Sequence, residues 1–334
     1  MKKSISIFLS LVVIGLNFAN AAAQAKGDIN TNPQKTYPSM DIETSPALQT
    51  LLNNAVGETL NNFAAKKVTP DSVAATLIDL RAPKNLKMAN YRGEQKIYPA
   101  SVVKLFYMAA LHRWLEDKRI KIFSPELERG LKDMIVDSSN EATQYILDVL
   151  TDTSSGGELP AKEFETWSYK RNAVNRYFES LGYENINVNQ KTFCEDAYGR
   201  EQQFRKYKGE NRNMLTTNAT ARLMTEIALG KSVSAERSKQ MLDLMRRDFS
   251  GTTKDADDQA HGFTAIALNE LELKDAKLWS KAGWTSKTRH DAAYIETPDG
   301  LKFVLVVFTE NFAQERDIIP SIASKIIKNF KQTR

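Results

Sequence analysis

The chain has 334 residues, of which 42% are hydrophobic and 26% are charged. This composition is that of a globular protein with enough apolar content for a sizeable core. The formal net charge is +5, and no block of Lys and Arg is interleaved with aromatic residues, which argues against a nucleic-acid partner. The three histidines, His112, His261 and His290, lack the close spacing of a ligand pair. We therefore expect no metal and no other cofactor.

Residues 1–25 have the pattern of a cleaved signal peptide. Lys2 and Lys3 precede the apolar run ISIFLSLVVIGL, and ANAAAQA then offers the small residues typical of a cleavage site. The apolar run is too short for a stable membrane anchor, and no later run approaches the roughly 20 apolar residues of a spanning helix. We therefore expect a periplasmic or secreted protein. Cys194 is the only cysteine, so the exported chain would have no internal disulfide.

The first predicted elements follow a polar stretch. Residues 26–45 are polar and contain prolines, and we expect a flexible N-terminal tail there. PALQTLLNNAVGETLNNFAAK (46–66) has apolar residues at helical spacing. Residues 71–93 then have the pattern of two strands joined by a turn around Pro83. From Ser101 onward the apolar residues recur mostly at i, i+3 and i+4, which predicts a series of helices.

Strand patterns return in the last quarter of the chain. The three segments are KLWSKAGWTSK, HDAAYIETP and LKFVLVVFTE, with a PDG hairpin signal between the last two, and an amphipathic helix follows. This order predicts an α/β (α+β) fold, with an antiparallel sheet built from both chain ends, flanking helices and an all-helical lobe. A single catalytic domain would span 46–334, with a sheet lobe at about 46–100 and 248–334 and a helical lobe at about 101–247.

The apolar helix near Ser101 carries a serine and a lysine one turn apart, in the sequence SVVK. Side chains at this spacing lie on one face of a helix. Burial would lower the pKa of Lys104, and a neutral amine can take the hydroxyl proton as Ser101 attacks a carbonyl. The helix N-terminus would add an N–H group beside the developing oxyanion. The alternative is a serine helix cap followed by a surface lysine.

Two later motifs favour the catalytic interpretation. SSN (138–140) lies between two helical patterns, where a serine hydroxyl can pass a proton to a leaving group. A helix cap would explain this serine pair as well. KAG (281–283) lies on a predicted strand, where the lysine would attract a substrate carboxylate and the glycine would permit close backbone approach. A solvated lysine beside a strand-breaking glycine is the alternative there.

The ordered motifs S-x-x-K, S-x-N and K-x-G are those of the penicillin-recognising serine enzymes. Together with its flanks, the sequence resembles the class A β-lactamase-like family over most of residues 46–334. The similar segments are YPASVVKLFYMAAL, SSNEATQYIL, VNRYFESLGY, NMLTTNATARLMTEIALG and RHDAAYIETPDGLKFVLVVFTE. The resemblance implies a β-lactamase/transpeptidase-like fold.

The resemblance also implies a role for each residue of the motifs. Ser101 would be the nucleophile, Lys104 its base or proton relay, and Ser138 the proton shuttle to the leaving nitrogen. The backbone N–H groups of Ser101 and Trp284 would form the oxyanion hole. The implied substrate-binding residues are Asn140, Lys281, Gly283, Thr285 and Arg289, the last two as partners of a substrate carboxylate.

Five features depart from the family's pattern. Ser139 stands where the family usually has aspartate, and Ala282 replaces a hydroxyl residue that would bind a substrate carboxylate. The gap between Ser101 and Ser138 is short for the family, and residues 150–172 look like an insertion. The fifth departure is the absence of the omega-loop Glu-x-x-x-Asn pattern, whose glutamate activates the deacylating water in class A enzymes.

The region in place of that loop is INVNQKTFCEDAYGREQQF, and its nearest carboxylates are Glu195 and Asp196. An exposed acidic pair is the alternative interpretation of these two residues. Without a deacylating carboxylate, acylation would proceed while turnover would be slow. A catalytic Ser–His pair that includes His290 is a further alternative. A histidine beside Arg289 at the start of a strand is more often structural or substrate-facing.

We therefore expect an exported serine hydrolase that opens a β-lactam or a related amide through an acyl-enzyme on Ser101. A D,D-peptidase, an esterase-like hydrolase and a slowly deacylating penicillin- or peptidoglycan-binding protein are the alternatives. The missing omega-loop glutamate favours these alternatives over an efficient β-lactamase. The expected partner is a small β-lactam or peptidoglycan-type substrate, and we expect a monomer.

Overall fold

The computed structural model describes residues 40–193 and 196–330. The expected signal peptide and residues 26–39 of the expected tail lie outside the described residues, as do Cys194 and Glu195. Within the described ranges, no helix combines the length and apolar character needed to cross a membrane.

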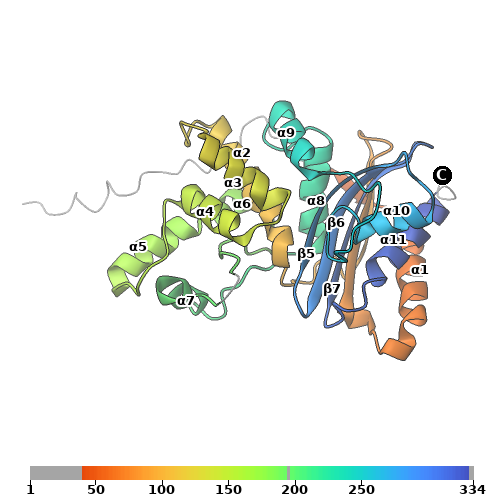
Figure 1. The fold of residues 1–334 in the computed structure, drawn as a ribbon, viewed down its shortest axis with the longest axis horizontal. Helices are drawn as coiled ribbons and strands as arrows, with labels where there is room; N and C mark the ends of the chain where they lie inside the picture. The colour runs from red at the N-terminus through yellow and green to blue at the C-terminus, as the bar shows by residue number, and fades with distance from the viewer. Residues whose placement is uncertain (1–39, 194–195, 331–334) are drawn as a thin grey trace, which may run out of the picture. The chain divides into compact units, whose positions relative to one another are not determined.

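The described part of the chain forms a seven-stranded sheet in the order β1-β3-β2-β7-β6-β5-β4 (Figure 1). The strands are β1 Ile42–Thr44, β2 Val73–Asp79, β3 Leu86–Tyr91, β4 Arg246–Arg247, β5 Lys277–Trp284, β6 Thr288–Glu296 and β7 Lys302–Glu310. All neighbouring pairs except β1 and β3 are antiparallel. The centre of the sheet pairs β2 with β7, so the two ends of the domain share one sheet, which confirms the predicted architecture.

β1 corrects the expected extent of the N-terminal tail. Ile42–Thr44 pairs in parallel with Leu86–Met88 at the sheet edge, although it falls within the range 26–45 expected to be flexible. Ser45 then caps helix α1 (Pro46–Asn62), because its Oγ accepts a hydrogen bond from Leu48 N at 3.3 Å. A three-residue edge strand is held mainly by backbone hydrogen bonds, so it leaves no alternating pattern in the sequence.

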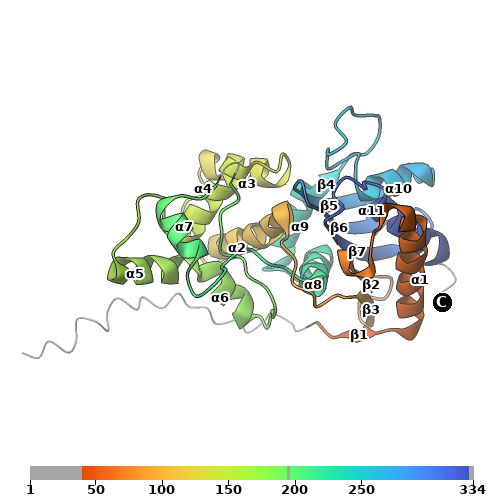
Figure 2. The ribbon, with the colours of Figure 1, turned by 90° about the horizontal axis from the view of Figure 1, so that it is seen from below.

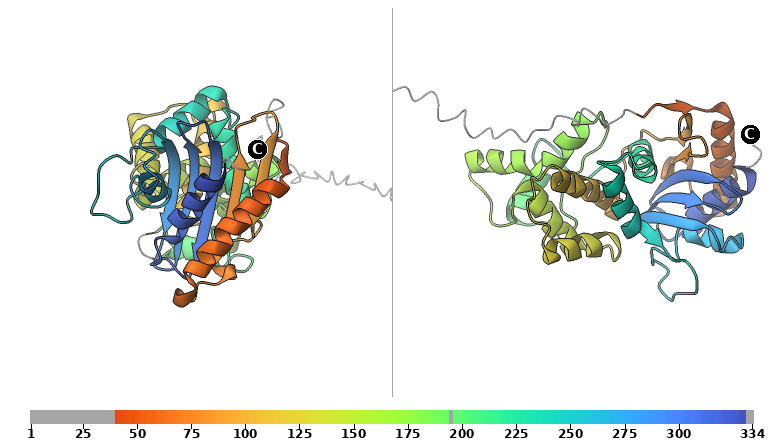
Figure 3. Two further views of the ribbon diagram at one scale, coloured as in Figure 1. Left: turned by 90° about the vertical axis from the view of Figure 1, so that its right-hand side faces the viewer. Right: turned by 90° about the horizontal axis from the view of Figure 1, so that it is seen from above.

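Helices cover both faces of this sheet. α1, α10 (Thr264–Glu270) and α11 (Ile318–Asn329) pack on one face and share a hydrophobic core with the apolar residues of the strands. Figure 3 shows α1 and α11 side by side in front of the strands. α8 (Thr217–Ala228) contacts β2, β6 and β7. α8 and β4 therefore belong to the sheet layer, although their residues lie within the range expected for the helical lobe.

The helical lobe is built around α2 (Lys104–Glu116), of which eleven of thirteen residues are buried. A helix that is apolar on all sides is usually buried, which explains the long run that begins at SVVK. Its neighbours include α3 (Pro125–Ile135), α4 (Asn140–Thr151), α6 (Ala173–Ser180) and α9 (Ala235–Met245). The remaining helices of the described lobe are α5 (Ala161–Arg171) and α7 (Gly199–Arg205), which Figure 2 shows beyond α2 and α4.

Candidate active site

Ser101 lies in a tight turn between the sheet and α2. It belongs to a short 3₁₀ helix, Ala100–Val103, which contacts β5 and β6 and leads directly into α2. The preceding residue, Ala100, has a φ of 46°, a left-handed conformation that is unfavourable for a residue with a Cβ. Ser101 is partly exposed, whereas its neighbours Val102 and Val103 are buried. The turn therefore presents one polar side chain on an otherwise buried segment.

Lys104 is fully buried at the start of α2. Its Nζ donates to Ser138 O, to Asn140 Oδ1 at 3.0 Å and to Ser138 Oγ at 3.2 Å. The alternative of a surface lysine is thus ruled out, and the lysine of the first motif contacts two residues of the second.

The serine pair divides two roles between its members. Ser139 is the helix cap of α4, because its Oγ accepts from Ala142 N at 3.0 Å. Ser138, with a φ of 57°, directs its backbone oxygen and its hydroxyl at Lys104. The helix-cap interpretation therefore holds for Ser139, while the role of Ser138 as a proton shuttle stays a prediction.

Lys281 is also fully buried, on β5. Its Nζ donates to Ser138 Oγ at 2.9 Å, to Ala282 O at 2.8 Å and to Gln259 Oε1. Burial holds the pKa of Lys281 well below its usual value, and the positive charges of Lys104 and Arg247 lower it further. The Ser138 hydroxyl thus lies between the amino groups of two buried lysines.

Gly283 brings β5 against the turn of Ser101. A Cβ at this position would lie 2.7 Å from Ser101 N, 2.8 Å from Pro99 O and 2.8 Å from Val102 N. These atoms all belong to the backbone, so only glycine fits without displacement of the turn. Trp284 follows at the end of β5, is partly buried and packs against the core and Phe263.

The structure does not bring Arg289 together with these groups. Arg289 is 2% exposed; its guanidinium pairs with Asp257 at 2.5 Å and lies 3.8 Å from the centroid of the Phe263 ring. Thr285 is exposed in the turn after β5, where its Oγ1 accepts a hydrogen bond from Thr288 N at 3.1 Å. Arg289 therefore binds the loop between β4 and α10, Thr285 binds within the turn between β5 and β6, and neither contacts Lys281.

His290 has a structural environment. Its Nε2 donates to Tyr98 O at 2.9 Å, and its Nδ1 accepts from Thr309 N at 3.1 Å. Burial lowers the pKa of His290 to about 4, so the ring is neutral at pH 7. Both ring nitrogens are occupied by backbone groups, which favours the structural interpretation over a Ser–His pair.

Comparison with known proteins identifies the family of this chain. A model of the β-lactamase enzyme family matches residues 55–330. The chain belongs to this family. A search of curated proteins finds no match.

Solved structures of the same fold include the β-lactamase from Sphaerobacter thermophilus, with 19% identity, a TM-score of 0.61, and coverage of 84% of this chain and 98% of that one. PBP-A has 18% identity, a TM-score of 0.57, and coverage of 89% and 100%. A PBP-A mutant in an acyl-enzyme complex with penicillin G has 18% identity, a TM-score of 0.55, and coverage of 84% and 97%. These similarities support the β-lactamase/transpeptidase-like fold.

The segment in place of the family's omega loop passes beside α4. Thr192 O accepts from Gln144 Nε2 at 3.1 Å, and Phe193 O accepts from Asn140 Nδ2 at 3.5 Å. Asp196 follows with a side chain that is 96% exposed and lies 3.4 Å from Arg205. Asp196 is therefore a solvated carboxylate, as the alternative interpretation of the acidic pair expects.

A buried ionic cluster of this β-lactamase-family chain was not predicted. Arg171 and Glu201 are both fully buried and form two hydrogen bonds, of 2.8 and 3.1 Å. Asp148 accepts from Arg171 at 2.9 Å and from Lys191 at 2.5 Å. The cluster ties α4, α5 and α7 to the segment beside the site. Its members are far apart in sequence, and no local pattern pairs them.

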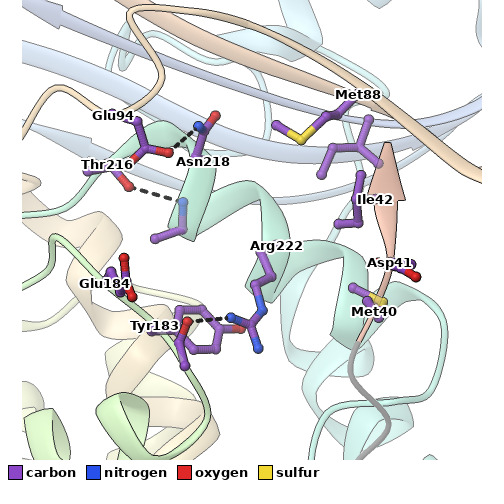
Figure 4. Close-up of a pocket in the computed structure, with 13 residues that line it drawn as sticks. Met40, Asp41, Ile42, Met88, Glu94, Tyr183, Glu184, Thr216, Asn218 and Arg222 are labelled. Carbon is purple, nitrogen blue, oxygen red and sulfur yellow. Dashed lines mark hydrogen bonds between the residues drawn. The ribbon is translucent and has the colours of Figure 1, made fainter. Parts of the chain in front are cut away.

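A separate pocket of about 380 Å³ lies beside α8 and β1 (Figure 4). Three of its polar side chains are engaged: Asn218 donates to Glu94 at 2.7 Å, and Arg222 donates to Leu181 O at 2.7 Å. No residue of the three motifs lines it. Among the described residues, no group of three or more His, Cys, Asp and Glu side chains is placed to hold a metal ion.

Proposed function

We propose that this protein is an exported serine hydrolase in which Ser101 attacks the carbonyl of a β-lactam or a related amide and carries the acyl group as an ester. The observation that carries the proposal is the position of the Ser138 hydroxyl, 3.2 Å from Lys104 Nζ and 2.9 Å from Lys281 Nζ. Two buried amines around one hydroxyl form a path for a proton between nucleophile and leaving group.

In the proposed acylation, the neutral Lys104 amine keeps its two N–H donors on Ser138 O and Asn140 Oδ1 and directs its lone pair at the Ser101 hydroxyl. It takes the Ser101 proton while the Ser101 oxygen bonds to the carbonyl carbon. The proton then passes through Ser138 to the leaving nitrogen as the carbon–nitrogen bond breaks. The N–H groups of Ser101 and Trp284 stabilise the oxyanion, each contributing about 3 kcal/mol at the transition state. Asn140 orients Lys104, since its Oδ1 accepts one hydrogen of the amine.

Slow release of the acyl group is the second part of the proposal. The solvated position of Asp196 favours a protein that acylates readily and deacylates slowly, as a penicillin- or peptidoglycan-binding protein would. A D,D-peptidase or an esterase with the same acyl-serine step is the alternative. The export pattern of residues 1–25 is consistent with a substrate outside the cytoplasm.

The test is incubation of the purified protein with a fluorescent penicillin and a chromogenic cephalosporin, beside Ser101→Ala. We expect a covalent adduct on Ser101 by mass spectrometry, with turnover slower than adduct formation. Rapid turnover would contradict only the slow-deacylation part of the proposal and would leave Ser101 as the nucleophile. If wild type and Ser101→Ala behave alike with both compounds and with peptide and ester substrates, Ser101 is not the nucleophile.

A further inference from the structure

We propose that this site accepts acyl donors that carry no carboxylate beside the leaving group, because the cations nearest the site are already bound by protein acceptors. This substrate class rests on the proposed acyl-serine function. It departs from the expectation that Lys281, Thr285 and Arg289 bind a substrate carboxylate.

Lys281 has no N–H donor left for a substrate. The amino group of a lysine has three hydrogen-bonding positions, and Lys281 Nζ uses all three, on Ser138 Oγ, Ala282 O and Gln259 Oε1. The residue is fully buried, so no face of its amino group is solvated. Its contact with Ser138 places it on the leaving-group side of the proposed reaction.

Gln259 is the acceptor that occupies the third donor. It comes from the loop between β4 and α10 and is 7% exposed. Its Oε1 also accepts from Ala282 N at 3.2 Å, while its Nε2 donates to Val136 O at 2.9 Å. The opposite amide orientation would set an NH₂ group against two donors, so the network fixes the oxygen toward Lys281. A substrate carboxylate would have to displace this oxygen.

The neighbouring strand offers no replacement cation on this face. His290 is the register partner of Gly283, is neutral, and uses both ring nitrogens for backbone groups. Its neighbour Arg289 points to the opposite face, since side chains alternate along a strand, and pairs there with Asp257. Ala282 contributes a methyl group to the core instead of a hydroxyl to the site.

A further cation near Lys281, Arg247, is also buried, and its Nε and Nη2 atoms are bound by backbone oxygens. Arg247 is 5% exposed and donates to Ser280 O at 2.9 Å and to Ile135 O at 3.1 Å. A carboxylate that entered beside Ser138 would lose hydration and would meet cations that are buried and already bound by protein oxygens, which is costly. An uncharged ester or amide avoids this cost, so the geometry points to neutral acyl donors.

The experiment compares benzylpenicillin with its methyl ester, which differ in one negative charge. The rate of acyl-Ser101 formation is followed by mass spectrometry, and each rate is divided by the rate of hydrolysis of the same compound in hydroxide. We expect the ester to acylate about tenfold faster or more, since a hydrogen bond to a charged group contributes about 1.5–3 kcal/mol. Faster acylation by the acid would overturn the proposal.

Gln259 variants test the cause. Gln259→Met frees one donor of Lys281 and should raise the acid-to-ester ratio about tenfold. Gln259→Glu keeps the acceptor, adds a negative charge and should lower that ratio. Gln240→Met, on α9, is the matched control and should leave it unchanged. If a thermal melt shows that Gln259→Met is not folded, Gln259→Glu provides the test. A lower acid-to-ester ratio in Gln259→Glu supports the proposal, and a higher one contradicts it.

The two proposals fail in different ways. If Ser101 is acylated faster by the acid than by the ester, only the proposed substrate class is overturned. The same holds if the Gln259 substitutions leave the acid-to-ester ratio of acylation rates unchanged. If neither penicillin compound nor p-nitrophenyl acetate acylates Ser101 in the wild type, the acyl-serine function is wrong and the substrate class is wrong with it.

Discussion

At the residue scale, Gly283 determines how closely the nucleophile's turn approaches β5. The Cβ that any other residue would add lies within 2.8 Å of three backbone atoms of the turn. Backbone atoms cannot rotate away as a flexible side chain can. The proposed oxyanion hole therefore depends on the absence of one methyl group.

Gly283→Ala should move the turn of Ser101 away from β5 and misplace the two N–H donors. We expect acylation by a fluorescent penicillin to fall by at least about 100-fold, because a displacement of about 1 Å in an active site has an effect of this size. Loss of the adduct is read by gel fluorescence, and folding is checked by circular dichroism. Acylation at the wild-type rate would contradict the assigned contact.

Gly57→Ala is the matched control for this substitution. Gly57 lies inside α1, and a Cβ there would meet no atom within 4 Å. Alanine in a helix interior is more stable than glycine by about 0.5–1 kcal/mol. Gly57→Ala should therefore raise the free energy of unfolding while leaving acylation unchanged.

At the element scale, the buried pair of Arg171 and Glu201 connects the helix of the expected insertion to α7. Arg171 also lies 4.5 Å from the ring centroid of Trp167, within a small cluster that includes Phe164 and Phe204. Both charged groups are fully buried, and each is the other's fully buried partner, with Asp148 as a further partner of Arg171.

Glu201→Gln should lower the free energy of unfolding by about 3 kcal/mol, because it leaves a buried guanidinium without its main counter-charge. Urea unfolding followed by fluorescence measures this loss. The double variant Arg171→Met/Glu201→Leu should recover most of it, since two apolar side chains need no ionic partner. Equal stability of Glu201→Gln and wild type would show that the pair is not needed for stability.

The elements also show which parts of the fold can be predicted from sequence. The run after Ser101 predicts a buried helix, and β5, β6 and β7 follow from short apolar segments and a hairpin signal. α5 and α7 bury one side against only a small aromatic cluster, so their apolar periodicity is weak. The three motifs predict that Lys104, Ser138 and Lys281 are neighbours. This prediction depends on the resemblance to the class A β-lactamase-like family and not on apolar periodicity.

Gln259 and the ionic cluster could not be predicted in this way. Gln259 lies in a loop without periodicity and reaches Val136, 123 residues earlier in the chain. Arg171 and Glu201 are 30 residues apart, in segments that look solvated by composition. Such contacts depend on how the lobes pack, and no local spacing encodes them.

At the scale of the whole molecule, two buried neutral histidines make stability depend on pH. Burial lowers the pKa of His112 to about 3 and that of His290 to about 4. An unfolded histidine has a pKa of about 6.5, so below that pH the unfolded chain takes up protons that the native protein does not. Native stability should therefore be complete above pH 6.5 and decline as the pH falls toward about 4.

His112→Leu tests this dependence. Neither ring nitrogen of His112 has a hydrogen-bond partner among the described residues, so an apolar side chain loses no contact there. Between pH 7.5 and 4.5 the wild type should lose about 2–3 kcal/mol more stability than the variant. Urea unfolding at the two pH values measures the difference. An identical pH dependence of the two proteins would contradict the buried neutral state of His112.

The pairing of β2 with β7 has a consequence for synthesis on the ribosome. Val73 lies opposite Thr309, so the centre of the sheet joins residues from the start and the end of the domain. The contact of Ser101 with Gly283 spans a similar stretch of chain. A nascent chain that has not yet reached β7 lacks the strand that completes the middle of the sheet. Folding is therefore expected to be post-translational and slow, as for other domains dominated by non-local contacts.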